Sequence, residues 1–561
     1  MKKEKYEILK TPHSEALGAV PHDYYPRPQF KRDSFLSLNG DWQFGFGDKA
    51  DGVIKVPFPP ESALSGVEKL GTNEEMLYEK SFTLPEKFNT GRLILHFGAV
   101  DTIATVTLNG SLLGAHEGGY HPFSFDITDF VKEENLLSVK VKDDLSGAFP
   151  YGKQKEKRGG MWYTPHSGIW QSVWLESVPC SGIEALRITP SVKDVRISVK
   201  AGGVSRKITL RDTGEEFVFS GDEIIISPKT VKNWTPEEPY LYYFTLETEF
   251  DKIESYFALR EIGIKDFDGI KRLALNGEPY LFNGLLDQGY FPDGIITPAT
   301  PDAFRDDILL AKECGFNMIR KHIKIEPLIF YHLCDVLGMA VFQDFVNNSD
   351  YSFMRDTAMP TVGFKSRSDK KLHKNALTRE IFEREAKATA ELLHNSPSVL
   401  YYTVFNEGLG QFCADEMYKK IKELAPDRII DATSGWFLQN ESDVDSRHIY
   451  FKPVKIDGYT GERPLVISEF GGFSHRVEGH LFGSDNYGYK KFKTREEFEA
   501  ALIKLYEDLI PLIGKGISAL VLTQISDVED ETNGLITYDR KALKVDPKKL
   551  SEVMKKLYAQ L

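Results

Sequence analysis

The sequence predicts a multidomain protein of class β plus α/β: two β-sandwiches followed by a (β/α)8 barrel. Its 561 residues are enough for about three or four domains. The first half is rich in short segments in which apolar and polar residues alternate, as they do in half-buried strands. After residue 264, apolar strand patterns alternate with helical patterns, which favours a parallel sheet covered by helices.

Residues 1–180 form the first predicted domain. Alternating segments occur at Leu93–Phe97, Ala104–Leu108 and Leu136–Val141. The pair Asn109-Gly110 follows the second segment, and it predicts a tight hairpin because both central positions of such a turn prefer positive φ. We therefore expect a β-sandwich here.

Residues 181–263 form the second predicted domain. Strand patterns occur at Glu184–Ile188, Val195–Val199 and Tyr240–Glu249. The length suits a smaller, immunoglobulin-like sandwich. Pro179 and the stretch Glu261–Ile264 are the expected boundaries.

Residues 264–561 form the third predicted domain, a TIM barrel. We expect eight strands, at 280–286, 317–323, 339–345, 398–406, 429–433, 447–452, 464–470 and 517–525. Helices are expected between most of them, at 302–314, 326–337, 379–394, 414–424 and 495–513. This repetition favours a closed barrel over an open doubly wound sheet, and it places any chemistry at the C-terminal ends of the strands.

The composition argues against nucleic acids and membranes as binding partners. The net charge is -13, which argues against nucleic acid, because phosphate binding needs clustered Lys and Arg. No run of about 18 uncharged apolar residues predicts a membrane span, and the charged N-terminus lacks a signal-peptide pattern. Scattered cysteines predict reduced thiols in a soluble cytoplasmic protein: Cys180, Cys314, Cys334 and Cys413.

Two carboxylates stand out at the ends of predicted barrel strands. Asn406-Glu407 closes the fourth strand, and Glu469 closes the seventh. Such a pair suits cleavage of a glycosidic bond, where one group donates a proton and the other meets the cationic sugar carbon. Carboxyl groups about 5–5.5 Å apart would retain configuration, and a wider gap would invert it. For either residue alone, a solvated or salt-bridged structural role is the alternative.

These motifs resemble those of glycoside hydrolase family 2, the group of β-galactosidases, β-glucuronidases and β-mannosidases. Asn406-Glu407 and Ser468–Gly471 are similar to the acid/base and nucleophile motifs of that family. Segments that match other family motifs extend the resemblance over nearly the whole chain: 38–44, 106–123, 168–176, 275–284 and 316–320. The resemblance implies a short three-domain member, with a sugar-binding-like jelly roll, an immunoglobulin-like sandwich and a catalytic barrel.

The resemblance also implies roles for individual residues. Glu407 would be the general acid/base and Glu469 the nucleophile. Asn406 would bind the sugar 2-hydroxyl, Arg320 would orient carboxylates in the floor of the site, and Tyr450 would donate a hydrogen bond to the nucleophile. A structural salt bridge is the alternative for Arg320, and a buried packing role is the alternative for Tyr450.

The chain departs from familiar members around the sugar site. Asp287, His322, Gln524 and Asp527 lie near predicted strand ends and could replace the usual sugar contacts, although each could equally be structural. Trp436, after the fifth strand, could supply the apolar platform that many relatives carry on strand eight; core packing of its indole is the alternative.

The sequence thus predicts a retaining exo-β-glycosidase, most like a β-galactosidase, with a carbohydrate substrate. No Asn-x-Lys occurs near residues 532–535, which argues against a glucuronidase. A pentosidase, a β-mannosidase, a transglycosylase and a non-catalytic carbohydrate-binding protein are the alternatives.

No cofactor or metal is expected. No phosphate loop or dinucleotide fingerprint follows a strand, the spacing of His116 and His121 does not fit a zinc helix, and the acidic run 527–531 lacks an EF-hand glycine. The resemblance allows a homo-oligomer, since dimers and tetramers are frequent in the family.

Overall fold

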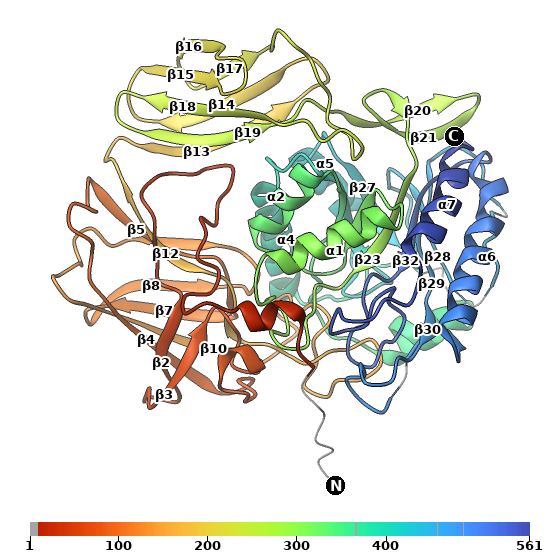
Figure 1. Cartoon of the computed structure of the whole chain (residues 1–561), viewed down its shortest axis with the longest axis horizontal. Helices are drawn as coiled ribbons and strands as arrows, with labels where there is room; N and C mark the ends of the chain where they lie inside the picture. Colours follow the sequence, from red (N-terminus) through yellow and green to blue (C-terminus); the bar gives the residue numbers. More distant parts are fainter. Residues whose placement is uncertain (1–8, 365–366, 451, 457, 486) are drawn as a thin grey trace.

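The computed structural model describes residues 9–364, 367–450, 452–456, 458–485 and 487–561. Residues 1–7, whose charges argued against a signal peptide, lie outside these ranges. Figure 1 shows a large β-sandwich beside the barrel and a smaller sandwich above both. The predicted fold class is confirmed, with many β-sheets in the N-terminal region and a nearly closed eight-stranded parallel barrel in the C-terminal part.

The first sandwich packs two main antiparallel sheets over one apolar core. Its hairpin at Asn109-Gly110 is confirmed, with φ of 55° and 81°. Exposed and buried residues alternate along its strands, because one face of each sheet meets the core. The strands are β1(Leu36–Ser37), β2(Gly40–Phe46), β3(Gly52–Val56), β4(Glu75–Phe82), β5(Arg92–Phe97), β6(Val100–Asp101), β7(Ile103–Leu108), β8(Ser111–Glu117), β9(Phe123–Asp126), β10(Asn135–Lys142), β11(Gly168–Ile169) and β12(Val173–Val178).

The second sandwich has one sheet of three strands and one of four. They are β13(Ile183–Pro190), β14(Val195–Ala201), β15(Ser205–Leu210), β16(Glu216–Ser220), β17(Glu223–Ile226), β18(Tyr242–Thr248) and β19(Lys252–Phe257). A small sheet then leads into the barrel: β20(Ile262–Phe267), β21(Ile270–Leu275) and β22(Glu278–Pro279).

The eight expected barrel strands are present and pair in parallel in the order β27-β26-β25-β24-β23-β32-β29-β28. A Ser434 Oγ to His448 Nε2 contact of 2.9 Å joins the two end strands, β27 and β28. The strands are β23(Phe282–Asp287), β24(Met318–Lys321), β25(Ala340–Asp344), β26(Val399–Asn406), β27(Ile429–Ser434), β28(Asp445–Ile449), β29(Leu465–Gly471) and β32(Ile517–Thr523). Several are buried at every position, because their outer faces meet helices and their inner faces fill the barrel.

Helices cover much of the barrel's outer surface. The α-helices are α1(Asp302–Glu313), α2(Leu328–Leu337), α3(Met359–Thr361), α4(Ala376–Leu392), α5(Ala414–Leu424), α6(Arg495–Ile513) and α7(Pro547–Tyr558), and shorter helical turns are η1(Pro12–Ala16), η2(Ala63–Ser65) and η3(Met354–Ala358). The described residues between β27 and β28, and between β28 and β29, form no helix. No described helix has the length and apolar character that crossing a membrane requires.

A segment between β10 and β11, the 143–167 loop, reaches from the first sandwich to the barrel mouth. The Tyr151 hydroxyl donates to the Ser349 carbonyl at 2.8 Å, and the Thr164 N–H donates to Glu529 Oε1 at 2.7 Å. Arg158 pairs with Asp530 at 3.1 Å. The first sandwich therefore forms part of the wall around the C-terminal ends of the barrel strands.

Candidate active site

Glu407 lies in the turn directly after β26, at the C-terminal end of the fourth barrel strand. Its φ is 51°, and that of the following Gly408 is 75°. A Cβ at Gly408 would overlap the Phe437 ring, so only glycine allows this turn to pack against the β27 side. The buried strand and the tight turn together present the carboxylate at the barrel mouth.

Glu469 lies within β29, the seventh strand, and is 5% exposed. The pairing of β29 with β32 shifts register between Ile467 and Phe470, an irregularity that re-aims side chains at this point. Gly472 follows with φ of 64°, and a Cβ there would overlap the Tyr489 ring. Gly472 thus allows the Tyr489 ring to pack against the strand end.

The two carboxylates face one another across the barrel mouth. One oxygen of Glu407 and one of Glu469 lie within 4.8 Å of each other. His448, on β28, lies between them: its Nδ1 is 2.7 Å from Glu407 Oε1 and 3.4 Å from Glu469 Oε2. The sequence motifs do not point to His448, although it lies in β28 two residues before Tyr450.

Arg320, at the end of β24, organises the floor of the site. Its guanidinium is 1% exposed and donates to Glu469 Oε1 at 3.3 Å and to Asn406 Oδ1 at 2.9 Å. Its Nε pairs with Asp344 at 3.0 Å. Burial opposes the charge on Asp344, yet Arg320 and His322 hold the pKa of this carboxyl down to about 2. Arg320 thus holds two carboxylates and the Asn406 amide in fixed positions.

Tyr450 follows β28. It contacts the Glu469 oxygen that Arg320 does not contact. Its hydroxyl donates to Glu469 Oε2 at 2.7 Å and lies 2.8 Å from Thr523 Oγ1. The ring stacks on Tyr489 with 4.0 Å between centroids. Burial, with the charges of the two catalytic candidates, raises the pKa of Tyr489. Each oxygen of Glu469 therefore has its own hydrogen-bond donor.

His322 is buried below this group, with Nδ1 2.6 Å from Asp344 Oδ2. Burial lowers its pKa. Its contact with Asp344 makes it a neighbour of Arg320 in the floor of the site.

Gln524, at the end of β32, belongs to a polar network on the other side of the mouth. Its Nε2 donates to Glu531 Oε2 at 3.0 Å and to Asn533 Oδ1 at 2.7 Å. The hydroxyl of Tyr163, from the 143–167 loop, donates to the same Glu531 oxygen at 2.8 Å. Burial raises the pKa of Glu531 to about 7, against the opposing charge of Lys153.

Neither Glu531 nor Lys153 was a candidate in the sequence. Lys153 is 6% exposed, and its charge lowers the pKa of both Glu531 and His322. A rule that looks only at strand ends in the barrel cannot find a lysine from another domain. Glu531 belongs to the acidic run 527–531, which follows the last barrel strand.

Asp287 and Asp527 lie outside this group. Asp287 pairs with Lys321 at 2.7 Å, and Asp527 pairs with Lys544 at 2.5 Å, with all four side chains buried. Their carboxylates are occupied by structural ion pairs rather than turned to Glu469.

Trp436 lies two residues after β27 and is half-buried. The backbone N–H of Trp436 donates to the Ser434 carbonyl at 3.2 Å. The backbone N–H of Glu407 donates to the same oxygen at 2.9 Å. The tryptophan backbone therefore lies beside Glu407.

The two facing carboxylates suit the cleavage of a single bond held between them. Glu469 is buried and held by hydrogen bonds from Arg320 and Tyr450. Glu407 is less buried, with 12% of its side chain exposed, and lies close enough to exchange a proton with an atom bound between them. No cofactor is needed for such a pair to act.

Known proteins are similar to this chain in sequence and in fold. Residues 50–174 match a family model described as "Glycosyl hydrolase 2 galactose-binding domain-like". A β-galactosidase of Thermoanaerobacter pseudethanolicus is 28% identical over 295 residues, which cover 48% of this chain and 39% of the relative. The β-galactosidase large subunit of Latilactobacillus sakei is 25% identical over 441 residues, covering 73% of this chain and 67% of the relative.

Two solved structures share the fold over almost the whole chain. The β-D-glucuronidase of Dictyoglomus thermophilum superposes with a TM-score of 0.75 at 17% identity, covering 96% of this chain and 99% of that chain. A GH2 β-galacturonidase of Eisenbergiella tayi superposes with a TM-score of 0.69 at 19% identity, covering 96% of this chain and 98% of that chain.

The chain spans about half the length of several curated relatives that it matches, at 39%, 52% and 45% of three of them. The family-model match covers the first sandwich, the sequence relatives extend into the barrel, and the solved structures share the complete architecture. In sequence and in fold the chain is therefore similar to members of glycoside hydrolase family 2.

Proposed function

We propose that this protein is a retaining exo-β-glycosidase that removes terminal sugars from oligosaccharides or glycoconjugates, most like a β-galactosidase in its substrate. One observation carries the proposal: oxygens of Glu407 and Glu469 lie within 4.8 Å of each other. Retaining enzymes hold their carboxyl groups about 5–5.5 Å apart, whereas inverting enzymes leave about 6.5–9.5 Å for a water molecule.

In the first step, Glu469 attacks the anomeric carbon while Glu407 donates its proton to the leaving oxygen. The glycosidic C–O bond breaks, and an ester bond forms between Glu469 and the sugar. The donors on Glu469, Arg320 and Tyr450, hold the carboxylate in position for attack. In the second step Glu407 takes a proton from water, the water oxygen replaces Glu469, and the sugar leaves with its original configuration.

Asn406 is proposed to bind the sugar 2-hydroxyl. Its Oδ1 accepts from Arg320, which fixes the orientation of the amide. Its Nδ2 is buried and has no hydrogen-bond partner among the described residues. A buried donor without a partner is costly, and a substrate hydroxyl would satisfy it.

The glycone is the finer part of the proposal. Curated relatives named β-galactosidase support a galactoside. A uronide is the second candidate, and Lys153 favours it: a buried cation near His322 and Glu531 can pair with a substrate carboxylate. Substitution Lys153→Met separates the two, since it would abolish turnover of a uronide and largely spare that of a galactoside.

The proposal is tested with a panel of nitrophenyl β-glycosides that includes a galactoside, glucuronide, galacturonide, mannoside and pentosides. At least one should be turned over, and Glu469→Gln should reduce that turnover by about three orders of magnitude or more. Glu423→Gln, on the exposed side of α5, is the matched control and should behave as wild type. Sugar binding with no turnover of any substrate would instead support the non-catalytic carbohydrate-binding protein.

We also infer a cytoplasmic location, supported by four cysteines that are all free. Cell fractionation tests this, and recovery of the protein outside the cytoplasm would contradict it. We also propose a homo-oligomer, because dimers and tetramers are frequent in the family that the chain resembles. Sedimentation velocity measures the oligomeric state.

A further inference from the structure

His448 lies between the two catalytic candidates, and the backbone around it holds its ring there. Its side chain is 1% exposed. The pairing of β28 with β29 shifts register between Arg447 and His448, which sets His448 opposite Glu469. On the other side Gly435 has φ of 88°, and a Cβ there would lie 2.5 Å from the imidazole Cγ. Glycine at this position therefore lets the ring pack closely against the end of β27.

The Nε2 side of the ring faces buried serine hydroxyls. Ser434 Oγ lies 2.9 Å from His448 Nε2, and it donates its own hydrogen to Ser468 Oγ, also at 2.9 Å. A serine hydroxyl has a single hydrogen. Because that hydrogen is directed at Ser468, the Ser434 oxygen accepts a hydrogen bond from His448 Nε2. Ser434 therefore places one proton of the ring on Nε2.

The Nδ1 side of the ring faces the two carboxylates. Nδ1 lies 2.7 Å from Glu407 Oε1, the length of a charge-assisted hydrogen bond, and 3.4 Å from Glu469 Oε2. Two atoms that each present only a lone pair do not form such a contact, so a proton lies between Nδ1 and Glu407 Oε1. Since Nε2 already has a proton, this second proton belongs jointly to the imidazole and to Glu407.

The other ionisable groups around this pair are balanced or uncharged at neutral pH, with one exception on β27. Arg320 balances the Glu469 carboxylate, donating to its other oxygen at 3.3 Å. The exception is Asp431, three residues before Ser434, and burial raises its pKa to about 6. Burial, with the Glu407 charge among the smaller causes, raises the pKa of three nearby tyrosines: Tyr450, Tyr487 and Tyr489.

We propose that His448 is a positioning residue for the acid/base: its imidazole, protonated on Nε2, shares the catalytic proton with Glu407 through Nδ1. The inference rests on the proposed function, in which Glu407 gives this proton to the leaving oxygen. After that step the ionised Glu407 faces an unprotonated Nδ1, and the repulsion between their lone pairs makes the carboxylate a stronger base. In the second step the pair takes one proton from the attacking water, which restores the starting state.

The shared proton makes Glu407 and His448 titrate as one unit. An acceptor at Nδ1 stabilises the protonated form of Glu407, whereas a donor at Nδ1 would stabilise the ionised form. Fixing the ring hydrogen on Nε2 therefore keeps the proton on the pair to higher pH. The alkaline limb of the pH profile of kcat/KM should lie where the pair loses this proton, because the acid is lost there.

The first test is nitrogen NMR of the full chain with isotope-labelled histidine rings, a measurement that needs no turnover. Ring nitrogens with and without a proton resonate far apart, and the signals missing in His448→Asn are those of His448. Above the pH at which the pair loses its proton, Nε2 should stay protonated and Nδ1 should be unprotonated.

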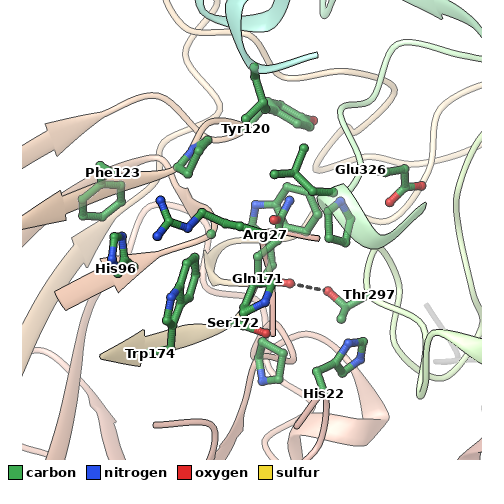
Figure 2. Close-up of a pocket in the computed structure, with 18 of the residues that line it drawn as sticks. His22, Arg27, His96, Tyr120, Phe123, Gln171, Ser172, Trp174, Thr297 and Glu326 are labelled. Atoms are coloured by element: carbon green, nitrogen blue, oxygen red, sulfur yellow. Dashed lines mark hydrogen bonds between the residues drawn. The ribbon is translucent and has the colours of Figure 1, made fainter. Parts of the chain in front are cut away.

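His96 is the internal reference for a buried neutral ring in the same spectra. It lines a separate cavity of about 230 Å³ between the first sandwich and the barrel (Figure 2). Burial lowers the pKa of His96 to about 3, so its signals should not move in the neutral range.

The second test is the pH profile of kcat/KM on a phenyl glycoside, whose poor leaving group needs the proton. Ser434→Ala releases Nε2, so the ring can carry its hydrogen on Nδ1 and donate to ionised Glu407. His448→Asn offers an amide donor at the same place. Each variant should move the alkaline limb to lower pH by about one unit.

Ser518→Ala is the matched control for the serine variant. Ser518 is a buried serine of β32, and its hydroxyl donates to the Gly516 carbonyl at 3.4 Å. Its replacement should leave the alkaline limb where it is in the wild type. Asp431 is present in every variant, so its titration does not contribute to the difference between them. Circular dichroism and a melting curve confirm that each variant is folded.

Two outcomes would overturn the proposal. In one, the neutral His448 ring carries its hydrogen on Nδ1, because that tautomer donates to an ionised Glu407 and cannot accept its proton. In the other, Ser434→Ala and His448→Asn lower kcat/KM at every pH and leave the alkaline limb in place, as a purely structural role would. Absence of turnover in the wild type would contradict the proposed function instead, and the NMR measurement would still decide the tautomer.

Discussion

Replacing Tyr450 by phenylalanine removes a hydrogen bond to the proposed nucleophile. The hydroxyl donates to Glu469 Oε2 at 2.7 Å, and the ring stacks on Tyr489. Phenylalanine keeps the stacking and removes the hydroxyl, and with it the 2.8 Å contact to Thr523 Oγ1. A hydrogen bond to a charged group contributes about 1.5–3 kcal/mol, which corresponds to a loss of roughly 10- to 100-fold in rate.

The loss of rate should affect mainly the second chemical step, the hydrolysis of the glycosyl-enzyme. When water releases the sugar, Glu469 leaves as a carboxylate, and the Tyr450 hydroxyl stabilises the charge that returns to Oε2. We therefore expect Tyr450→Phe to slow hydrolysis of the glycosyl-enzyme more than its formation. Stopped-flow measurement with an activated dinitrophenyl glycoside should show a burst of phenolate followed by a slow steady state.

Tyr163→Phe is the matched control, because its hydroxyl donates at 2.8 Å to Glu531 rather than to Glu469. It removes a bond of the same kind from another carboxylate, and we expect no burst. A fall in kcat of less than about threefold for Tyr450→Phe, which is below 1 kcal/mol, would refute the reasoning. Equal bursts in both variants would also refute it.

Three further predictions follow from the site and its surroundings. Glu407→Ala should slow hydrolysis of phenyl glycosides about 100-fold or more and that of dinitrophenyl glycosides far less, since only poor leaving groups need the proton; equal losses in steady-state kinetics would remove Glu407 from the acid role. Lys544→Met leaves Asp527 buried without its 2.5 Å partner and should lower the free energy of unfolding by about 3–5 kcal/mol in denaturant titration. Adding Asp527→Asn to this variant should restore part of the loss. Equal stability of the single and the double variant would contradict this. Between its ordinary pKa of 4.5 and its folded pKa of about 7, Glu531 binds a proton that the unfolded chain lacks, so stability falls as pH rises through that window. Glu531→Gln should flatten the fall by up to about 3 kcal/mol, and an unchanged pH dependence of unfolding would argue against the raised pKa.

Much of the fold could be predicted because its signals are local. Alternation along β7 and β10, the Asn109-Gly110 turn and the apolar runs of the barrel strands are each readable from a few adjacent residues. The absence of helices among the described residues around β28 was harder to predict, since a missing helix leaves no pattern of its own.

Candidate site residues could be predicted where they lie at the C-terminal ends of barrel strands. The strand-end rule finds Glu407 and Glu469, the family resemblance adds Arg320 and Tyr450, and the structure brings the four together. Asp287 obeyed the same rule, yet it lies in an ion pair with Lys321. The sequence does not show which strand-end carboxylate has a lysine beside it in space.

Other site residues could not be predicted because their positions depend on contacts between domains. Lys153 and Tyr163 lie more than a hundred residues before the barrel, in a loop of the first sandwich. Only the packing of that loop against residues 529–531 brings them to the barrel mouth. The first sandwich is therefore part of the candidate site, which the pairwise motifs in the barrel do not reveal.

The central claim is a double displacement through Glu469, and the configuration of the first sugar released tests it most directly. Proton NMR recorded within the first minutes of hydrolysis of an active β-glycoside distinguishes the two anomers before they equilibrate. The account predicts that the β-anomer appears first and the α-anomer only later, by mutarotation. Initial release of the α-anomer would contradict it, since that result requires a direct attack by water across a wider gap than the structure shows.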